Sequence, residues 1–216
     1  MILKRLFNLF TLKLRFRFVA TTLLIVLFSS FEASAKHILV YGDSLSAAYG
    51  MDEEKGWVNL LATTADHDLK VTNASISGET SSGGLARLKI TLEEIAPDLV
   101  ILELGANDGL RGYSTELLKK NLEKMIVATK TSGAELVLAA ISLPPTHGPR
   151  YIDSFREVYF ELAEEHTIPL LDLYQPSFVE TPGFIQEDGL HPTEITQPII
   201  KDLVINFLLD NNFLEK

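Results

Sequence analysis

Ser44 stands where a short apolar run of the sequence ends. Ile38, Leu39 and Val40 predict a buried strand, and the Gly-Asp-Ser that follows places a small hydroxyl residue just beyond its carboxyl end. A serine hydroxyl acts as a nucleophile only when a base takes its proton, a third group orients that base, and donors stabilise the oxyanion. Without such partners, Ser44 would be an ordinary turn residue.

A base for Ser44 is available in the segment that ends at His191. Asp188 precedes His191 by three residues, and Gly189 between them allows a tight turn. A carboxylate at this spacing can hold Nδ1 of the imidazole, so that Nε2 accepts the serine proton. We therefore predict that Ser44 is the nucleophile, His191 the general base and Asp188 the orienting acid. For His147, which also lies in a loop after a predicted strand, a solvated position is the simpler interpretation.

Donors for the oxyanion are available in two further loops. Gly78 offers a backbone N–H that no Cβ obstructs, although a glycine there could also serve only a turn. Asn107 offers a side-chain amide with two N–H donors, although it could instead close its own loop. The N–H of Ser44, which enters a helical turn, is the third predicted donor. We interpret Asp43 and Asp108 as groups that brace their loops rather than as catalytic acids.

The elements that must bring these residues together alternate between short β-rich runs and longer helical patterns. The predicted strands are residues 37–41, 70–74, 98–104, 135–141 and 168–171, and the predicted helices are residues 57–68, 84–95, 114–131, 153–166 and 192–209. Ser114 is suited to cap the third of these helices and Gly133 to end it, while Pro192 fits the first turn of the last. The alternation predicts an α/β fold, namely a flavodoxin-like three-layer α/β/α sandwich around a five-stranded parallel sheet.

Ligands of doubly wound folds bind beyond the carboxyl ends of the strands. The segments that follow the second, third and fourth predicted strands, and one beyond the fifth, are polar and contain glycine; they are residues 75–84, 105–109, 142–151 and 187–194. Because the carboxyl ends of parallel strands meet at one edge of the sheet, we expect these segments to gather around Ser44.

The first 35 residues have the pattern of a secretory signal peptide. Residues 1–17 contain five basic side chains and no acidic one, residues 18–28 are almost all apolar, and Ala33-Ser34-Ala35 fits a small-x-small cleavage site. The apolar core is much shorter than the roughly 20 residues that span a bilayer. We therefore predict cleavage after Ala35 and a periplasmic or secreted domain over residues 36–216. An uncleaved N-terminal membrane anchor is the alternative.

The charge of the chain argues against nucleic acid as a partner. The 216 residues include 19 basic and 29 acidic side chains, of which five basic and one acidic belong to the predicted leader, so the remainder carries a net charge of −14. Such a surface repels nucleic acid and anionic lipid headgroups. The chain has no cysteine, which excludes disulfides, a thiol nucleophile and thiolate metal ligands. We expect a monomer that needs no metal or cofactor and that does not insert stably into a membrane once the leader is cleaved.

Four short motifs resemble, in order, the four blocks of the SGNH (GDSL) hydrolases. They are GDSLS, SGETSSGG, GAND and DGLHP. The resemblance extends from about Ile38 to Val204. Within the family, the chain more narrowly resembles the periplasmic acyl-CoA thioesterase I, lysophospholipase and arylesterase type. The resemblance implies the same roles for the residues predicted above, which are Ser44, Gly78, Asn107, Asp188 and His191.

The resemblance also implies an activity, the hydrolysis of acyl esters and thioesters such as arylesters, acyl-CoA and lysophospholipids through an acyl-enzyme. A carbohydrate O-acetylesterase or an acyltransferase would use the same residues, and a non-catalytic binding protein is the alternative from another class. Ser46 stands where a G-x-S-x-G motif would have its second glycine, which argues against an α/β-hydrolase proper. The resemblance further implies a wall for the acyl chain in residues 142–151, where a plain connecting loop is the alternative. The predicted wall residues are Leu143, Pro144, Pro145 and Tyr151.

Overall fold

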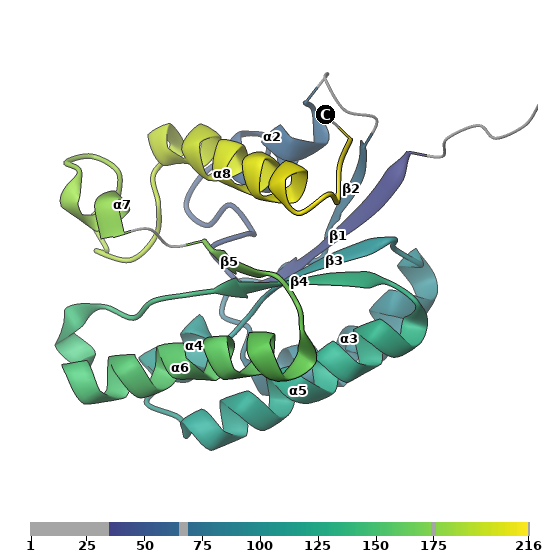
Figure 1. Ribbon diagram of the computed structural model, residues 1–216. Coiled ribbons are helices and arrows are strands. Elements are labelled where there is room, and N and C mark those ends of the chain that lie inside the picture. Colours follow the sequence, from purple (N-terminus) through teal and green to yellow (C-terminus); the bar gives the residue numbers. More distant parts are fainter. Residues whose placement is uncertain (1–34, 65–68, 174–175, 216) are drawn as a thin grey trace, which may run out of the picture. The chain divides into compact units, whose positions relative to one another are not determined.

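Five parallel strands form the sheet of the computed structural model, which describes residues 35–64, 69–173 and 176–215. The order across the sheet is β2-β1-β3-β4-β5 (Figure 1), and each neighbouring pair is parallel. The strands are β1 (Lys36–Gly42), β2 (Leu69–Asn73), β3 (Leu99–Glu103), β4 (Glu135–Ala140) and β5 (Leu170–Asp172). The predicted five-stranded, doubly wound sheet is confirmed.

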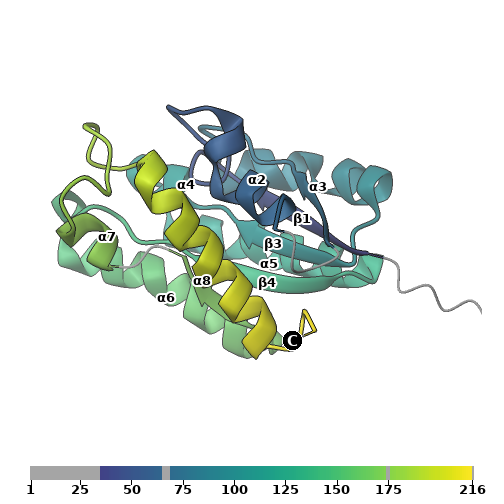
Figure 2. The same cartoon turned by 90° about the horizontal axis from the view of Figure 1, so that it is seen from above.

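Helices cover both faces of the sheet, as Figure 1 shows from the side and Figure 2 from above. One face carries α2 (Trp57–Ala62), α7 (Pro176–Glu180) and α8 (Gln197–Asp210), and the other carries α3 (Ser81–Ile95), α4 (Ala106–Leu110), α5 (Thr115–Ser132) and α6 (Pro149–His166). Three short 3₁₀ turns complete the elements of the described residues: η1 (Glu53–Lys55), η2 (Pro145–His147) and η3 (Glu194–Thr196). The predicted three-layer sandwich is therefore confirmed as well.

Alternate residues of β1 build the two halves of the core. Ile38 and Val40 belong to the apolar cluster that includes Trp57 of α2. Leu39 and Tyr41 belong to the cluster on the other face, under α3, α5 and α6. Because successive side chains of a strand point to opposite faces, a strand that is apolar throughout must be buried on both.

The predicted limits of α5 agree with the structure. Oγ of Ser114 accepts the N–H of Leu117, and Gly133 ends the helix in the left-handed conformation with φ +91. Helix α3 instead begins three residues before its predicted start, because the side chain of Thr80 caps it by accepting the N–H of Gly83.

Three other helices differ from the prediction, and one of them, α6, begins at Pro149 rather than at residue 153. Helix α2 ends at Ala62 rather than at residue 68, and the hydroxyls of Thr63 and Thr64 donate back to carbonyls of its last turn; residues 65–68 lie outside the described part of the chain. Helix α8 begins at Gln197 rather than at Pro192. Pro192 forms an antiparallel bridge with Ile185, so the segment before the helix is paired in an extended conformation.

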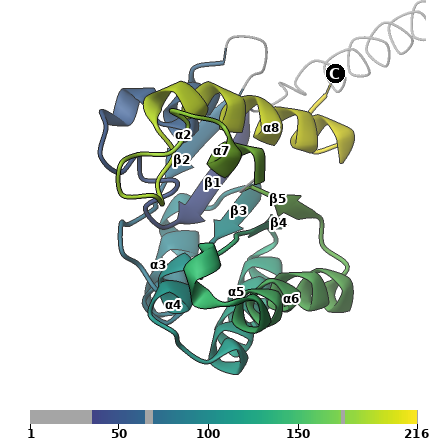
Figure 3. The same cartoon turned by 90° about the vertical axis from the view of Figure 1, so that its left-hand side faces the viewer.

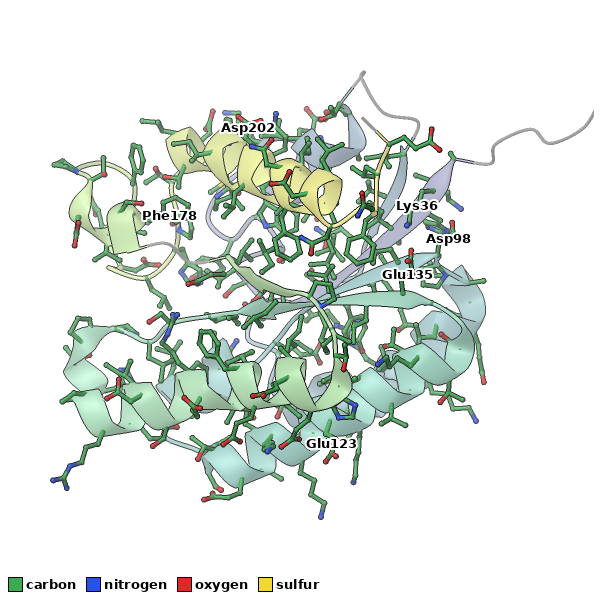
Figure 4. All side chains as sticks on the ribbon, in the orientation of Figure 1. Lys36, Asp98, Glu123, Glu135, Phe178 and Asp202 are labelled. Carbon is green, nitrogen blue, oxygen red and sulfur yellow. The ribbon has the colours of Figure 1, made fainter. Side chains whose placement is uncertain are left out.

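The carboxyl ends of the strands lie at the left of Figure 1 and face the viewer in Figure 3. The opposite edge is held by structural contacts: the ammonium of Lys36 donates to Glu135 at 2.5 Å, and the carboxylate of Asp98 accepts the N–H of His37 at 2.7 Å (Figure 4). Among the described residues, no helix combines the length and the apolar content that crossing a membrane requires. The predicted signal peptide lies, apart from Ala35, outside these residues and stays a prediction.

Candidate active site

Ser44 lies in a turn directly after β1. The N–H of Ala47 donates to the carbonyl of Asp43 at 3.0 Å, and the N–H of Ser46 donates to the same carbonyl at 3.3 Å. The chain thus makes one helical turn, and N–H groups at the start of such a turn have no partner within it. The N–H of Ser44 has no hydrogen-bond partner in the described part of the chain, so it is available to a ligand.

Asp188 and His191 are held together by a single tight turn. Oδ1 of Asp188 accepts the N–H groups of Leu190 at 2.9 Å and of His191 at 3.0 Å, and Gly189 takes a φ of +71. Nδ1 of His191 lies 2.6 Å from Oδ2 of Asp188, and Nε2 lies 2.8 Å from Oγ of Ser44. Since an ionised carboxylate only accepts, Nδ1 carries the proton and Nε2 faces the serine hydroxyl as an acceptor. The structure brings these three predicted residues together.

The charge of Asp188 is favoured by its surroundings. Burial raises its pKa, but hydrogen bonds from the imidazole and the N–H of His191 and from the N–H of Leu190 outweigh burial, and the pKa lies below its ordinary value. Asp188 is therefore ionised at neutral pH and can stabilise a positive charge on His191.

The ring of Tyr49 packs against His191. The two ring centroids are 4.3 Å apart, with an angle of 33° between the planes. The side chain of His191 is 11% exposed, against 37% for Asp188. Sequence reasoning missed Tyr49, because no spacing rule connects a residue of the Ser44 loop with the Asp188 turn. Tyr49 shields one face of the imidazole and restricts its rotation.

Asn107 lies in α4, the short helix that the GAND motif forms where the sequence indicated only a loop. Its Nδ2 donates to Oδ2 of Asp43 at 3.1 Å, and Oδ1 of Asp43 accepts the N–H of Leu45 at 3.1 Å. An ionised carboxylate cannot donate, so this contact fixes which end of the amide faces Asp43. The second N–H of Asn107 stays available, and Asp43 braces the loop as predicted.

Gly78 occupies a β-turn in which the N–H of Glu79 donates to the carbonyl of Ile76 at 3.1 Å. Its φ of +81 lies in the region that favours glycine. The N–H of Gly78 has no partner among the residues that the structure describes. Turn and donor are thus compatible roles for this glycine.

Asp108 braces the same side of the site, as predicted. Its two carboxylate oxygens accept the N–H of Ser81 at 2.7 Å and the hydroxyl of Ser81 at 2.6 Å. Arg111 donates to the carbonyl of Gly78 at 3.1 Å. Residues after β3 thereby hold the loop that contains Gly78.

Two carboxyl groups are completely buried under this site, and both are 0% exposed. Burial raises the pKa of Asp43 to about 6, although the N–H of Leu45, the amide of Asn107 and the nearby His191 act in the opposite direction. Burial, and then the charge of Asp43, raise the pKa of Glu103 well above its ordinary value. Sequence reasoning missed Glu103, and the signal for it was an acid within the otherwise apolar run LVILEL of residues 99–104.

A narrow cleft opens beside Ser44 and His191. Its lining residues are Ser44, Leu45, Ala106, Leu110, Ile141, Ser142, Leu143, Leu190 and His191. Of the four predicted wall residues, Leu143 lines the cleft, whereas Pro144, Pro145 and Tyr151 do not belong to its lining. The hydroxyl of Tyr151 donates to the carbonyl of Tyr113 at 2.7 Å, so this side chain connects the first turn of α6 with the segment before α5.

His147 is partly exposed, which agrees with the predicted solvated position. Its ring is half-buried, with Nδ1 3.3 Å from the carbonyl of Pro144 and Nε2 3.5 Å from the carbonyl of Leu110. Two backbone carbonyls thus lie beside this partly exposed imidazole. In the described part of the chain, no group of three or more histidine, cysteine, aspartate or glutamate side chains is placed to hold a metal ion.

The sequence model of the GDSL-like Lipase/Acylhydrolase family matches residues 40–197, which is more than half of the chain. The chain belongs to this family. The part that matches the GDSL-like family contains the Ser44 turn, Gly78, Asn107 and the Asp188–His191 turn.

Relatives within the GDSL-like family are similar over most of their length. An arylesterase of Vibrio mimicus is 43% identical over 196 residues, which cover 89% of this chain and 98% of the relative. The thioesterase 1/protease 1/lysophospholipase L1 of Escherichia coli (strain K12) is 40% identical over 187 residues, covering 87% and 90%. The crystal structure of the psychrotrophic esterase EstA from Pseudoalteromonas sp., inhibited by monoethylphosphonate, has a TM-score of 0.78 and 37% identity, covering 82% of this chain and 98% of that one.

Proposed function

We propose that this protein is a serine hydrolase that cleaves acyl esters and acyl thioesters through an acyl-enzyme. The observation that carries the proposal is the continuous contact from Asp188 through His191 to Ser44, with distances of 2.6 Å and 2.8 Å. The names of the relatives, arylesterase, thioesterase and lysophospholipase, support arylesters, acyl thioesters and lysophospholipids as the substrate class.

The proposed reaction begins when Oγ of Ser44 attacks the acyl carbonyl carbon and Nε2 of His191 takes its proton. Asp188 holds Nδ1 and stabilises the imidazolium. The N–H groups of Ser44 and Gly78 and the amide of Asn107 donate to the oxyanion of the tetrahedral intermediate. His191 then gives its proton to the leaving alcohol or thiol. Water attacks the acyl-enzyme by the same steps and restores the free hydroxyl.

The cleft beside Ser44 is the proposed site of the acyl chain. Six of its lining residues are apolar, namely Leu45, Ala106, Leu110, Ile141, Leu143 and Leu190. An apolar cleft that begins at the nucleophile favours a hydrocarbon chain, because burying each CH₂ group is worth about 0.8 kcal/mol.

Replacement of the serine tests the nucleophile. We expect Ser44→Ala to abolish covalent labelling by a fluorophosphonate and to lower turnover of p-nitrophenyl butyrate by at least about 10⁴-fold. Ser177→Ala, at an exposed serine of α7, is the control and should label as the wild type does. Labelling that persists in Ser44→Ala would refute the assignment.

A substrate series tests the activity itself. Rates with p-nitrophenyl esters from acetate to palmitate, with an acyl-CoA and with a lysophospholipid should show hydrolysis of both esters and thioesters. Activity confined to acetyl groups on a carbohydrate would favour an O-acetylesterase, and transfer to an added alcohol in preference to water would favour an acyltransferase.

Because the imidazole must be neutral to accept the serine proton, the rate of hydrolysis should also fall on acidification.

We also propose that residues 1–35 are a signal peptide and that residues 36–216 form an exported, monomeric hydrolase domain. The apolar core before Ala33-Ser34-Ala35 supports this proposal. Expression of the full chain in a Gram-negative host should yield a periplasmic protein whose N-terminus is Lys36, and size-exclusion chromatography should give the mass of one copy. A chain that keeps its leader and fractionates with membranes would contradict the cleavage.

A further inference from the structure

Glu103 is a buried acid whose place next to the Ser44 turn calls for an explanation. It is the last residue of β3 and lies directly opposite Gly42, the last residue of β1, in the register of the sheet. Its side chain is 0% exposed, and none of the ion pairs among the described residues includes it. Glutamate is almost never fully buried unless it is paired.

The contacts of Glu103 lie on both sides of Ser44 in the chain. Oε2 accepts the N–H of Asp43 at 3.2 Å and the hydroxyl of Ser46 at 2.7 Å. Asp43 immediately precedes Ser44, and Ser46 follows it by two residues. One carboxyl oxygen on β3 therefore holds the beginning and the end of the turn that carries the hydroxyl group.

Gly42 leaves room for this carboxyl group. A Cβ at residue 42 would lie 2.4 Å from Oε2 of Glu103 and 2.9 Å from the carbonyl oxygen of Glu103, both closer than real Cβ atoms approach. The φ of Gly42 does not call for glycine, since Gly42 is not among the glycines with positive φ. The first residue of the GDSLS motif is thus a glycine because the side chain of Glu103 occupies the space beside it.

We propose that Glu103 is a positioning residue, which holds the Ser44 turn so that Oγ of Ser44 stays within reach of both His191 and the substrate carbonyl. This inference rests on the proposed role of Ser44 as the nucleophile. Glu103 acts through Asp43 and Ser46 and touches neither the substrate nor His191.

Glu103 can do this only as a neutral acid. Its Oε1 is buried and has no hydrogen-bond partner within the described chain, and Asp43 already brings one carboxyl charge to the same region. A second unpaired charge here would carry a large desolvation cost, in agreement with the raised pKa of Glu103. The neutral form keeps Oε2 as an acceptor, which a glutamine amide oxygen at the same position can replace.

Two substitutions at residue 103 test the proposal. Glu103→Leu removes the acceptor, and we expect kcat for p-nitrophenyl butyrate and the rate of fluorophosphonate labelling to fall at least about tenfold with KM nearly unchanged. Glu103→Gln keeps the acceptor, and we expect both rates to stay within about threefold of the wild type. Tyr159→Phe is the matched control, because it removes another buried hydrogen bond close to Glu103, from the hydroxyl of Tyr159 to the carbonyl of Leu104, the first residue after β3, at 3.0 Å. It should lower stability while leaving kcat unchanged.

Several outcomes would overturn the proposal. Wild-type rates in Glu103→Leu, or an equal loss in Glu103→Leu and Glu103→Gln, would each do so. Should Glu103→Leu fail to fold, Ser46→Ala decides: it should slow labelling a few-fold with KM unchanged, and wild-type labelling would reject the proposal. Amide hydrogen exchange of Asp43, which should be faster in Ser46→Ala than in the wild type, reports on the turn without any reference to activity. An unlabelled, inactive wild-type protein would reject the proposed function instead.

Discussion

The two sides of the active site are built in opposite ways. On the base side, Asp188 and His191 lie in one turn, the hydrogen bonds of the Asp188 carboxylate span at most three residues, and this carboxylate is 37% exposed. On the nucleophile side, Asp43 and Glu103 are completely buried, and their partners come from the turn after β1, from β3 and from α4. The base side is a local structure, and the nucleophile side is a product of the whole sheet.

This difference separates activity from stability. A change on the base side should disturb the chemistry and leave the fold almost intact, because few buried contacts depend on it. A change on the nucleophile side should disturb both, because a buried polar group that loses its partner costs about 1–3 kcal/mol. Variants on each side can therefore confirm or break the comparison.

Asp188→Asn should have the largest effect of the four variants considered next. The amide Oδ1 can still accept the N–H groups of Leu190 and His191, so the turn persists. The amide nitrogen now faces Nδ1, which favours the wrong imidazole tautomer, and we expect kcat to fall by about 10⁴-fold. Urea unfolding should show a change in stability below about 1 kcal/mol. Glu187→Gln, at the exposed residue next to Asp188, is the control and should retain wild-type activity. A strongly destabilised Asp188→Asn would contradict the conclusion that the base side contributes little to stability.

Asn107→Ala should come second and should affect both properties. Loss of one oxyanion donor typically costs about 10²–10³ in kcat, and we expect KM to change little. Oδ2 of Asp43 also loses its donor in the interior, so the free energy of unfolding should fall as well. Asn59→Ala, which removes the exposed hydrogen bond from Asn59 to the carbonyl of Glu54, should leave kcat unchanged. Steady-state kinetics and urea unfolding on both variants would show whether kcat and the free energy of unfolding fall together in Asn107→Ala only.

Asp43→Asn should reveal that Asp43 and Asp188 affect stability in opposite ways as pH changes. The ordinary pKa of an aspartate is 3.8, and the pKa of folded Asp43 is raised to about 6. Between these two pH values, folded Asp43 binds more protons than unfolded Asp43. The contribution of Asp43 to stability is therefore lost as pH rises through this window. The pKa of Asp188 is lowered, so its contribution is present above the ordinary value and is lost only as pH falls through the folded value.

Urea unfolding at several pH values between 4 and 7 measures this difference. Relative to Asp43→Asn, which does not titrate, the wild type should become less stable as pH rises through the window of Asp43. A difference between the two proteins that is independent of pH would show that Asp43 does not titrate there.

Tyr49→Leu should have the smallest effect. Aromatic ring pairs are worth about 0.5–1.5 kcal/mol, so we expect kcat/KM to fall by less than about tenfold through a less restricted His191. Phe160→Leu is the matched control, because Phe160 on α6 is 46% exposed and Tyr49 is 48% exposed. Equal and wild-type rates in both variants would show that the ring does not restrain the imidazole.

The same contrast explains how much of the protein could be predicted from its sequence. Asp188 and His191 were recognisable because their contact depends on a spacing of three residues and one glycine. The limits of α5 were recognisable for the same reason, since Ser114 and Gly133 act on their own helix. The sheet followed from the alternation of apolar runs with helical patterns.

The contacts that could not be predicted join residues far apart in the chain. Glu103 reaches Asp43 and Ser46 only because β3 pairs with β1 in one particular register, and an acid in an apolar strand does not reveal its partners. The contact between the rings of Tyr49 and His191 likewise joins two segments that no local sequence pattern connects. The start of α8 was predicted too early for a different reason: Pro192 also suits an extended conformation, in which it pairs with Ile185 in the same local segment.

The hydroxyl of Ser44 and the imidazole that faces it are separated by 147 positions in the chain. A ribosome therefore completes the serine loop long before it adds the histidine. A nascent or prematurely terminated polypeptide that stops short of residue 191 has its hydroxyl but no proton acceptor. The contact between the hydroxyl and the imidazole therefore forms only after the last portion of the chain has been made and has folded against the sheet.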